Sequence, residues 1–219
     1  MLWIEQIQSA NWREAGTIAL GAYILGCFTT GYYLVRRRVG EDIRELGSGS
    51  VGARNVGRFL GGSGFIVTLF GDFAKGAVAV WAAGQFSHDT RLLALSMLAV
   101  VAGHIWPAQL FFRGGKGVAT SLGALAIYDF QLAVVLALTF AVGWLLLRNF
   151  VFAGLIAFAS LPWLSLWLGH SSNPDYPKVC SLALLAALIW IAHRKNLVEE
   201  FSEFLERRSL HPKQNPPDL

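Results

Sequence analysis

The chain has 219 residues, of which 54% are hydrophobic and only 15% are charged, with a formal net charge of +4. A soluble domain carries about 25% charged residues, so this composition excludes an ordinary soluble protein and indicates an all-α protein that crosses the membrane several times. The net charge alone says little about partners, because in such a protein the distribution of Lys and Arg carries the information. We expect no nucleic-acid partner, no cofactor and no metal site.

A membrane-spanning helix needs about 20 largely apolar residues, and the hydrophobic runs divide the chain into seven candidate spans. We treat residues 1–219 as one domain, with a core of about 15–201 and a C-terminal tail of about 202–219. The start of the chain lacks the pattern of a cleavable signal peptide. The candidate spans lie at about residues 15–35, 62–85, 92–112, 118–128, 131–147, 150–168 and 179–192.

The distribution of basic residues predicts the orientation. If the loop at residues 36–58 is cytoplasmic, fourteen of the eighteen Lys and Arg residues lie on the cytoplasmic side. Arg13, Arg91 and Lys178 remain outside, and Lys75 lies within a span. Lys and Arg concentrate on the cytoplasmic side of membrane proteins, so we expect the N-terminus outside and the C-terminus inside.

A first glycine segment, residues 47–58, contains four glycines and two arginines between two spans. Glycine permits positive φ, so successive N–H groups can converge on one anion, with Arg54 and Arg58 supplying charge. The segment also fits G-x-G-x-x-G, but no parallel strand precedes it, which argues against a dinucleotide site. A flexible loop remains the simpler alternative; Ser48, Asn55 and Arg58 favour phosphate binding instead.

A second glycine segment, residues 113–120, reads Arg-Gly-Gly-Lys-Gly-Val-Ala-Thr. It lacks the first glycine and the Ser/Thr after Lys116 that a nucleotide-binding P-loop requires. Glycines directly before a helix leave N–H groups free, and the helix dipole and Lys116 add positive charge. The segment therefore suits a phosphate or phosphate ester, although a basic anchor at lipid headgroups is the plain alternative.

A third polar cluster, residues 193–196, follows the last candidate span. His193 and Asn196 are three positions apart and share a helix face, so both can contact one ligand. An interfacial aromatic side chain is the common role for such a histidine. As a site residue, His193 suits a general base or a hydrogen-bond donor to phosphate, and the sequence leaves both open.

Within the spans, Asp72 and Lys75 are three residues apart and share a helix face, which indicates an ion pair. Charged groups at this depth also raise the possibility of a function. His104 is interpreted as a structural partner of another span.

Two further patterns carry no functional prediction, and we treat the first of them as a coincidence. Residues 170–175 fit H-x4-D, an acyltransferase signature, but the predicted orientation leaves them outside and apart from the other clusters. Cys27 and Cys180 lie in apolar segments far apart in the sequence, and we interpret them as packed thiols.

Taken together, the motifs resemble the bacterial acyl-phosphate:glycerol-3-phosphate acyltransferases, the PlsY family of seven-span inner-membrane enzymes, over about residues 25–201. The resemblance is carried by Gly47-Ser-Gly49 with Asn55 and Arg58, Asp72-Phe-Ala-Lys-Gly76, Gly103-His-Ile-Trp-Pro107, Gly114-Gly-Lys-Gly-Val-Ala-Thr120 and His193-Arg-x-Asn196.

The resemblance implies transfer of a fatty acyl group from acyl phosphate to the 1-hydroxyl of glycerol 3-phosphate, without an acyl carrier protein. It implies that the products are lysophosphatidate and phosphate, that the step belongs to phospholipid biosynthesis, and that the site faces the cytoplasm. The implied active-site residues are Ser48, Arg58, Lys116, His193 and Asn196. We expect a monomer, with phosphate binding by Gly47, Gly49, Gly52, Arg54, Asn55, Gly114, Gly115 and Gly117.

Three positions depart from the family pattern of G-S-G-N-x-G-A-T-N and H-R-E-N. Ser50 replaces Asn, Arg54 replaces Thr and Lys195 replaces Glu. Arg54 either strengthens phosphate binding or crowds the acceptor pocket. These changes motivate an alternative, a relative that binds phospholipid precursors or acylates another acceptor. A transporter is a third reading, less favoured because transporters concentrate polar features near mid-membrane.

Overall fold

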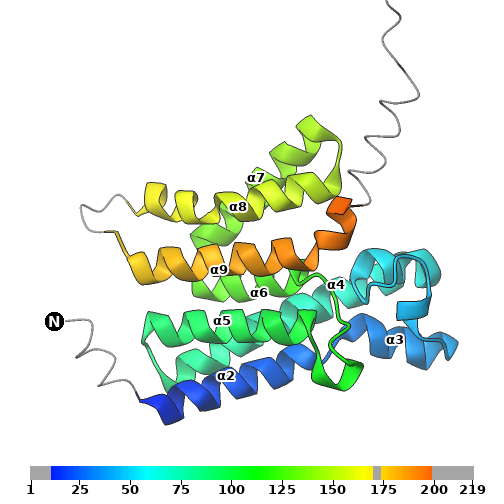
Figure 1. Cartoon of the computed structure of the whole chain (residues 1–219), viewed down its shortest axis with the longest axis horizontal. Helices are drawn as coiled ribbons and strands as arrows, with labels where there is room; N and C mark the ends of the chain where they lie inside the picture. The colour runs from blue at the N-terminus through cyan, green and yellow to red at the C-terminus, as the bar shows by residue number, and fades with distance from the viewer. Residues whose placement is uncertain (1–10, 170–173, 199–219) are drawn as a thin grey trace, which may run out of the picture.

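The computed structural model describes residues 11–169 and 174–198, and the regular secondary structure of this part of the chain is entirely helical (Figure 1). The prediction of an all-α fold is confirmed. The helices are α2 (Trp12–Cys27), α3 (Thr30–Val39), α4 (Ala53–Phe86), α5 (Thr90–Ile105), α6 (Val118–Tyr128), α7 (Phe130–Leu147), α8 (Phe150–Leu168) and α9 (Tyr176–Ala192), with 3-10 turns η1 (Ile43–Glu45) and η2 (Ala108–Leu110).

Five stretches of the described chain are long and apolar enough to cross a membrane. They are Trp12–Val39, Ala53–Phe86, Thr90–Leu110, Phe130–Leu147 and Phe150–Leu168, and α6 and α9 are shorter apolar helices. These seven stretches correspond to the seven predicted segments. Predicted residues 118–128 and 150–168 coincide with α6 and α8.

The first predicted span, 15–35, is not one helix, which corrects the sequence prediction. Helix α2 ends at Cys27 and α3 begins at Thr30, with extended backbone at Phe28 and Thr29. No proline or glycine pair marks this break. Backbone groups freed inside a membrane need partners, and here side chains from α4 and the α5–α6 loop supply them, as described below.

Helix α4 contains a second break, at Gly61, where φ is +67° and ψ is −163°. Residues 53–60 therefore form a separate short helix before the long part of α4. The predicted second span began at residue 62, directly after this break. Glycine is the residue that adopts this backbone without steric strain.

Close helix contacts hold the bundle together where glycines face another backbone. A Cβ added at Gly76 of α4 would lie 2.1 Å from the carbonyl oxygen of Thr120 in α6, and one at Gly123 would lie 1.9 Å from that of Phe73. Helices in membranes associate through such small residues, because packing rather than water exclusion drives their contact. The α4–α6 pair therefore fixes where the second glycine segment meets the bundle.

Helices α2 and α3 run one after the other in the same direction, and from α3 onward successive helices run alternately between the two ends of the bundle (Figure 1). The ends of α3, α5 and α9 and the starts of α4, α6 and α8 gather at one end, opposite the start of α2. All three predicted polar segments lie at that end.

The cysteines differ in their surroundings. Cys27 is buried, as predicted, but Cys180 is exposed on the outer side of α9, so the prediction of a packed thiol is wrong there. Its position in an apolar helix gave no sign of which face was covered. The predicted tail and His170 of the H-x4-D pattern lie outside the described residues.

Candidate active site

The first glycine segment is shaped by one buried side chain, Asn55, which is 2% exposed. Its Oδ1 accepts a hydrogen bond from the backbone N–H of Ser48 at 3.1 Å. Its Nδ2 donates to the carbonyl oxygens of Leu46 at 2.9 Å and Ser50 at 3.0 Å, with Ile43 more distant at 3.4 Å. The Asn55 amide thus defines the loop conformation rather than reaching outward.

Two of the four glycines in this segment adopt the positive φ that the sequence predicted. Gly47 has φ +57° and Gly49 has φ +67°. A side chain at Gly47 would also collide with Asn55, because an added Cβ would lie 2.4 Å from Oδ1. Gly52 is instead the N-cap of α4 with extended backbone. The turn leaves the Ser48 side chain exposed at the surface.

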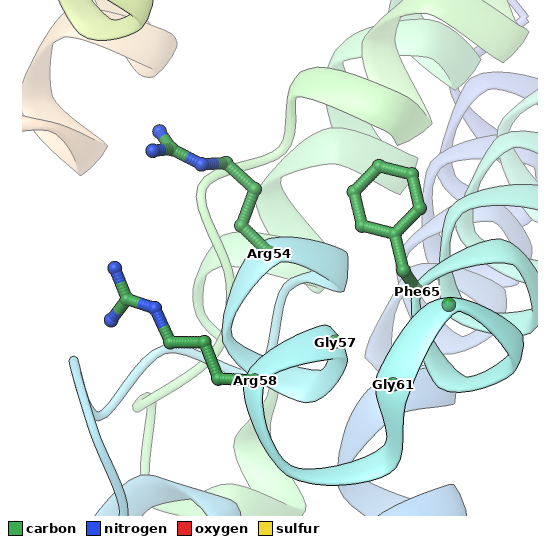
Figure 2. Close-up of a pocket in the computed structure, with 6 residues that line it drawn as sticks. Arg54, Gly57, Arg58, Gly61 and Phe65 are labelled. Carbon is green, nitrogen blue, oxygen red and sulfur yellow. The ribbon is translucent and has the colours of Figure 1, made fainter.

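Arg54 and Arg58 lie one turn apart on the short helix 53–60 and line the same pocket. Its other lining residues are Gly57, Gly61, Gly62 and Phe65, and its volume is about 290 Å³. Figure 2 shows the two guanidinium groups extending in the same direction, away from the helix. The Arg54 guanidinium lies 4.6 Å from the ring centroid of Phe150 at the start of α8, a cation–π contact that the sequence did not predict.

The second glycine segment differs from its prediction in one respect. The N–H of Gly114 donates to the carbonyl oxygen of Ile105 at 3.1 Å, and that of Gly115 donates to His104 at 3.0 Å. These amides therefore hold the loop against the end of α5. The sequence predicted that they would be free, and for these two amides that prediction is wrong. Gly117 has φ +81° and is the N-cap of α6, where no side chain caps the helix.

The first and second segments are joined by side-chain contacts. Arg44 of η1 donates to the carbonyl oxygen of Leu110 at 2.8 Å, and it is oriented by its ion pair with Asp42 at 2.6 Å. The Arg44 hydrogen bond lowers the pKa of the Asp42 carboxyl, which keeps the pair charged. Arg113 also lies 3.7 Å from Glu45 at the exposed surface. No local pattern predicted these contacts, because Arg44 and Leu110 lie 66 residues apart.

The second and third segments meet at α9. Gly117 packs against Ile189: a Cβ added at Gly117 would lie 3.1 Å from Ile189 Cδ1. His193 is buried and ends α9, and its Nδ1 lies 2.8 Å from the Ile189 carbonyl oxygen. A carbonyl oxygen only accepts, so Nδ1 carries the proton and Nε2 keeps its lone pair.

The electrostatics of His193 favour its neutral form. Burial lowers the pKa of its imidazole, and the positive charge of Lys116 lowers it further against the opposing hydrogen bond to Ile189. Lys116 and His193, predicted from separate motifs, are thus electrostatic neighbours. Asn196 follows, half-buried, in the helical stretch 194–198.

The predicted residues fall into two groups at one end of the bundle. Arg54 and Arg58 line the pocket, and Lys116 interacts with His193, while neither Lys116 nor Asn196 is among the six residues that line that pocket. Sequence reasoning missed Phe65 and Phe150. Both are apolar residues within predicted spans, and nothing in the sequence distinguishes them from the other apolar residues there.

The comparisons with known proteins identify one family. Residues 16–203 match the family model described as glycerol-3-phosphate acyltransferase. The chain is 44% identical over 200 residues to glycerol-3-phosphate acyltransferase 1 of Desulfitobacterium hafniense, covering 90% of this chain and 97% of that protein. It is 41% identical over 190 residues to the glycerol-3-phosphate acyltransferase of Thermus thermophilus, covering 85% and 91%.

The fold is similar to a solved membrane protein. The crystal structure of PlsY, an integral membrane glycerol 3-phosphate acyltransferase in its glycerol 3-phosphate form, superposes with a TM-score of 0.77 at 32% identity. The match covers 86% of this chain and 92% of that one. The lysophosphatidic acid form of the same protein gives a TM-score of 0.75.

Proposed function

The chain belongs to the glycerol-3-phosphate acyltransferase family, and we propose that it transfers a fatty acyl group from acyl phosphate to the 1-hydroxyl of glycerol 3-phosphate. The products are lysophosphatidate and inorganic phosphate. The observation that best supports this assignment is that Gly117, next to Lys116, packs against Ile189 one turn before the buried His193, at the end of the bundle that also carries Arg54 and Arg58.

Acyl phosphate is a mixed anhydride and is already activated, so the protein needs no covalent nucleophile. The glycerol oxygen bonds to the acyl carbon, the bond from that carbon to the phosphate oxygen breaks, and phosphate leaves with the electron pair. The hydroxyl proton passes to a base. The protein has to hold two phosphate groups close together and stabilise the charge that develops on oxygen.

The basic residues fit this task. Arg58 and Lys116 bind phosphate and stabilise the leaving group, and Arg54 adds charge beside Arg58. Ser48 and Asn196 donate hydrogen bonds to the substrates. Gly47, Gly49, Gly52, Gly114, Gly115 and Gly117, together with Asn55, contribute by forming loops with the required backbone rather than by side-chain chemistry.

The base is either His193 or a phosphate oxygen of the substrate. The Nδ1–H tautomer supports His193, because it leaves the Nε2 lone pair for a proton. Turnover of His193→Ala and His193→Gln in detergent or lipid separates the two. A loss of about 100-fold or more in kcat fits a general base, whereas near-normal rates exclude His193 from that role.

We propose a seven-span topology in the bacterial inner membrane, and the distribution of charge supports an active site at the cytoplasmic face. Among the described residues, the end of the bundle that carries the site holds Arg36, Arg37, Arg38, Arg44, Arg54, Arg58, Arg113, Lys116, Arg148, Arg194 and Lys195. The opposite end holds Arg13, Arg91 and Lys178. This bias orients the N-terminus outward and the C-terminus inward. We further propose that the single domain acts as a monomer.

The deciding experiment measures phosphate release by the purified protein from acyl phosphate, with and without glycerol 3-phosphate. Release that depends on glycerol 3-phosphate and forms lysophosphatidate supports the proposal. Equal release without it, or turnover only with acyl carrier protein, contradicts it. Alternative alcohols in the same assay test whether Arg54 has changed the acceptor.

A further inference from the structure

Three ionisable side chains are buried within the helical bundle, outside the three polar segments. Asp72 and Lys75 of α4 are 2% and 5% exposed, and His104 of α5 is 3% exposed. Lys75 Nζ lies 3.0 Å from Asp72 Oδ1 and 2.7 Å from His104 Nδ1. Ionisable groups at membrane depth are costly, so a cluster of three calls for a specific role.

The cluster first closes the break between α2 and α3. Lys75 Nζ donates to the carbonyl oxygens of Gly26 at 3.1 Å and Phe28 at 2.7 Å. Asp72 Oδ1 accepts from the backbone N–H of Thr30 at 3.3 Å and from its hydroxyl at 3.1 Å. One ion pair of α4 therefore caps the C-terminal end of α2 and the N-terminal end of α3.

The same cluster then supports the second glycine segment. With Lys75 donating to Nδ1, the proton of a neutral His104 lies on Nε2, which faces Gly115. An added Cβ at Gly115 would lie 2.1 Å from Nε2, and its three nearest atoms all belong to the His104 ring. The Gly115 N–H also donates to the His104 carbonyl at 3.0 Å. The loop that carries Lys116 thus lies directly on His104.

We propose that Asp72, Lys75 and His104 are positioning residues for acyl transfer. They connect the residues at the break between α2 and α3 to His104 of α5. They thereby fix the position of the second glycine segment, which contains Lys116, relative to His193. The inference rests on the proposed function for its kinetic consequence, whereas the mechanical link between Lys75, His104 and Gly115 stands on the contacts alone.

The kinetic test combines His104→Ala with Gly115→Ala. Each single change is expected to lower kcat/KM for glycerol 3-phosphate about 100-fold, with most of the loss in KM, because a misplacement of about 1 Å has effects of this size. Removing the ring also removes the collision, so Gly115→Ala costs nothing further in the His104→Ala background. If the loss of kcat/KM in the double variant, expressed as a free energy, equals the sum of the two single losses, the proposal is overturned, because independent sites are additive.

Lys75→Met and His104→Asn test the upstream link. Lys75→Met removes the donors and is expected to raise KM as His104→Ala does, whereas His104→Asn keeps an acceptor near Nδ1 and retains more activity. The control is Lys178→Met, which breaks the 2.6 Å ion pair with Asp129 at the opposite end of the bundle and should leave KM unchanged. Variants that lose thermal stability with a normal KM refute a positioning role.

A readout independent of turnover separates this inference from the reaction itself. Amide hydrogen exchange at residues 113–117 should accelerate in Lys75→Met and remain unchanged in Lys178→Met. Wild-type protein that releases no phosphate with glycerol 3-phosphate refutes the proposed function, and the exchange result still decides the positioning role. Unchanged exchange in Lys75→Met overturns it.

Discussion

The backbone nitrogen of Ser48 donates to Asn55 Oδ1 at 3.1 Å, so the exposed serine is held by a buried amide seven residues further along the chain. The same amide donates to the carbonyls of Leu46 and Ser50 on either side of Ser48. A side chain that both accepts and donates within one loop fixes its conformation. Asn55 is therefore a positioning residue for Ser48.

Asn55→Asp should impair the enzyme although it preserves size. A carboxylate accepts from Ser48 but cannot donate to Leu46 and Ser50, and leaving buried polar groups unpaired costs about 1–3 kcal/mol each. We expect kcat/KM to fall by about 100-fold, and we expect thermal stability to fall as well, because two buried carbonyl oxygens lose their donor. Steady-state kinetics and thermal unfolding in detergent measure both quantities.

The matched control for Asn55 is Ser50→Ala. Ser50 Oγ accepts only a 3.3 Å bond from the Gly52 N–H among its described contacts, so its loss should change kcat/KM by less than about threefold. If Asn55→Asp keeps wild-type activity, the loop does not depend on the amide donors.

The sequence predicted what local chemistry determines. Apolar run lengths located α6 and α8, and they began the second predicted span at residue 62, directly after a break in α4 that was not itself predicted. The break between α2 and α3 escaped prediction because its stabilising groups lie far away in the sequence. They are Asp72, Lys75 and Gln109, whose side-chain amide donates to the carbonyl oxygen of Cys27.

The same limit applies to the site. Residue types and glycine density identified the three polar segments, but not how their backbone groups are used. The amides of Gly114 and Gly115 were expected to be free and instead pair with α5 carbonyls. The pairing of these amides with α5 depends on tertiary packing. The residue spacing within the second glycine segment contains no information about that packing.

Gly61→Ala should destabilise the protein through its backbone alone. Gly61 has φ +67° and ψ −163°, a backbone conformation essentially limited to glycine, and open space around its missing side chain, so any cost comes from conformation, about 1–3 kcal/mol. Gly62→Ala is the control, because Gly62 is equally open but has no positive φ. Thermal unfolding should show a lower Tm for Gly61→Ala only. A loss shared equally by both variants would mean that open space, not φ, is needed here.

The contact of Arg54 with Phe150 predicts a difference between two variants. Phe150→Leu removes the cation–π contact, worth about 0.5–1 kcal/mol at exposed sites, and the edge-to-face contact with Phe140. Of these two contacts only the first involves Arg54, so KM for glycerol 3-phosphate should rise less than about fivefold. Arg54→Thr, the family residue, also removes the charge beside Arg58. We expect it to raise KM about tenfold if Arg54 binds phosphate. A lower KM in Arg54→Thr would show that Arg54 crowds the acceptor pocket.

The pH dependence of kcat/KM should report the neutral state of His193 in the free enzyme. Burial and the charge of Lys116 lower the pKa of the imidazole from the ordinary value of 6.5, so a base at this position remains unprotonated below that pH. Activity should therefore fall on the acid side only below pH 6.5. Removing the Lys116 charge makes protonation of His193 easier. In the pH profile of the residual activity of Lys116→Met, the acid limb, that is the fall in activity at acid pH, should therefore lie at higher pH than in wild type. Arg113→Met, which removes a nearby cation paired with Glu45, should leave the limb in place.

The assignment of that limb needs one further variant, because phosphate esters also titrate with a second pKa of about 6. His193→Gln removes the titrating imidazole. If the acid limb belongs to His193, the residual activity of this variant becomes independent of pH across the range where wild type declines. A limb that persists unchanged in His193→Gln belongs to the phosphate of glycerol 3-phosphate, and the substrate rather than the imidazole then controls the pH dependence.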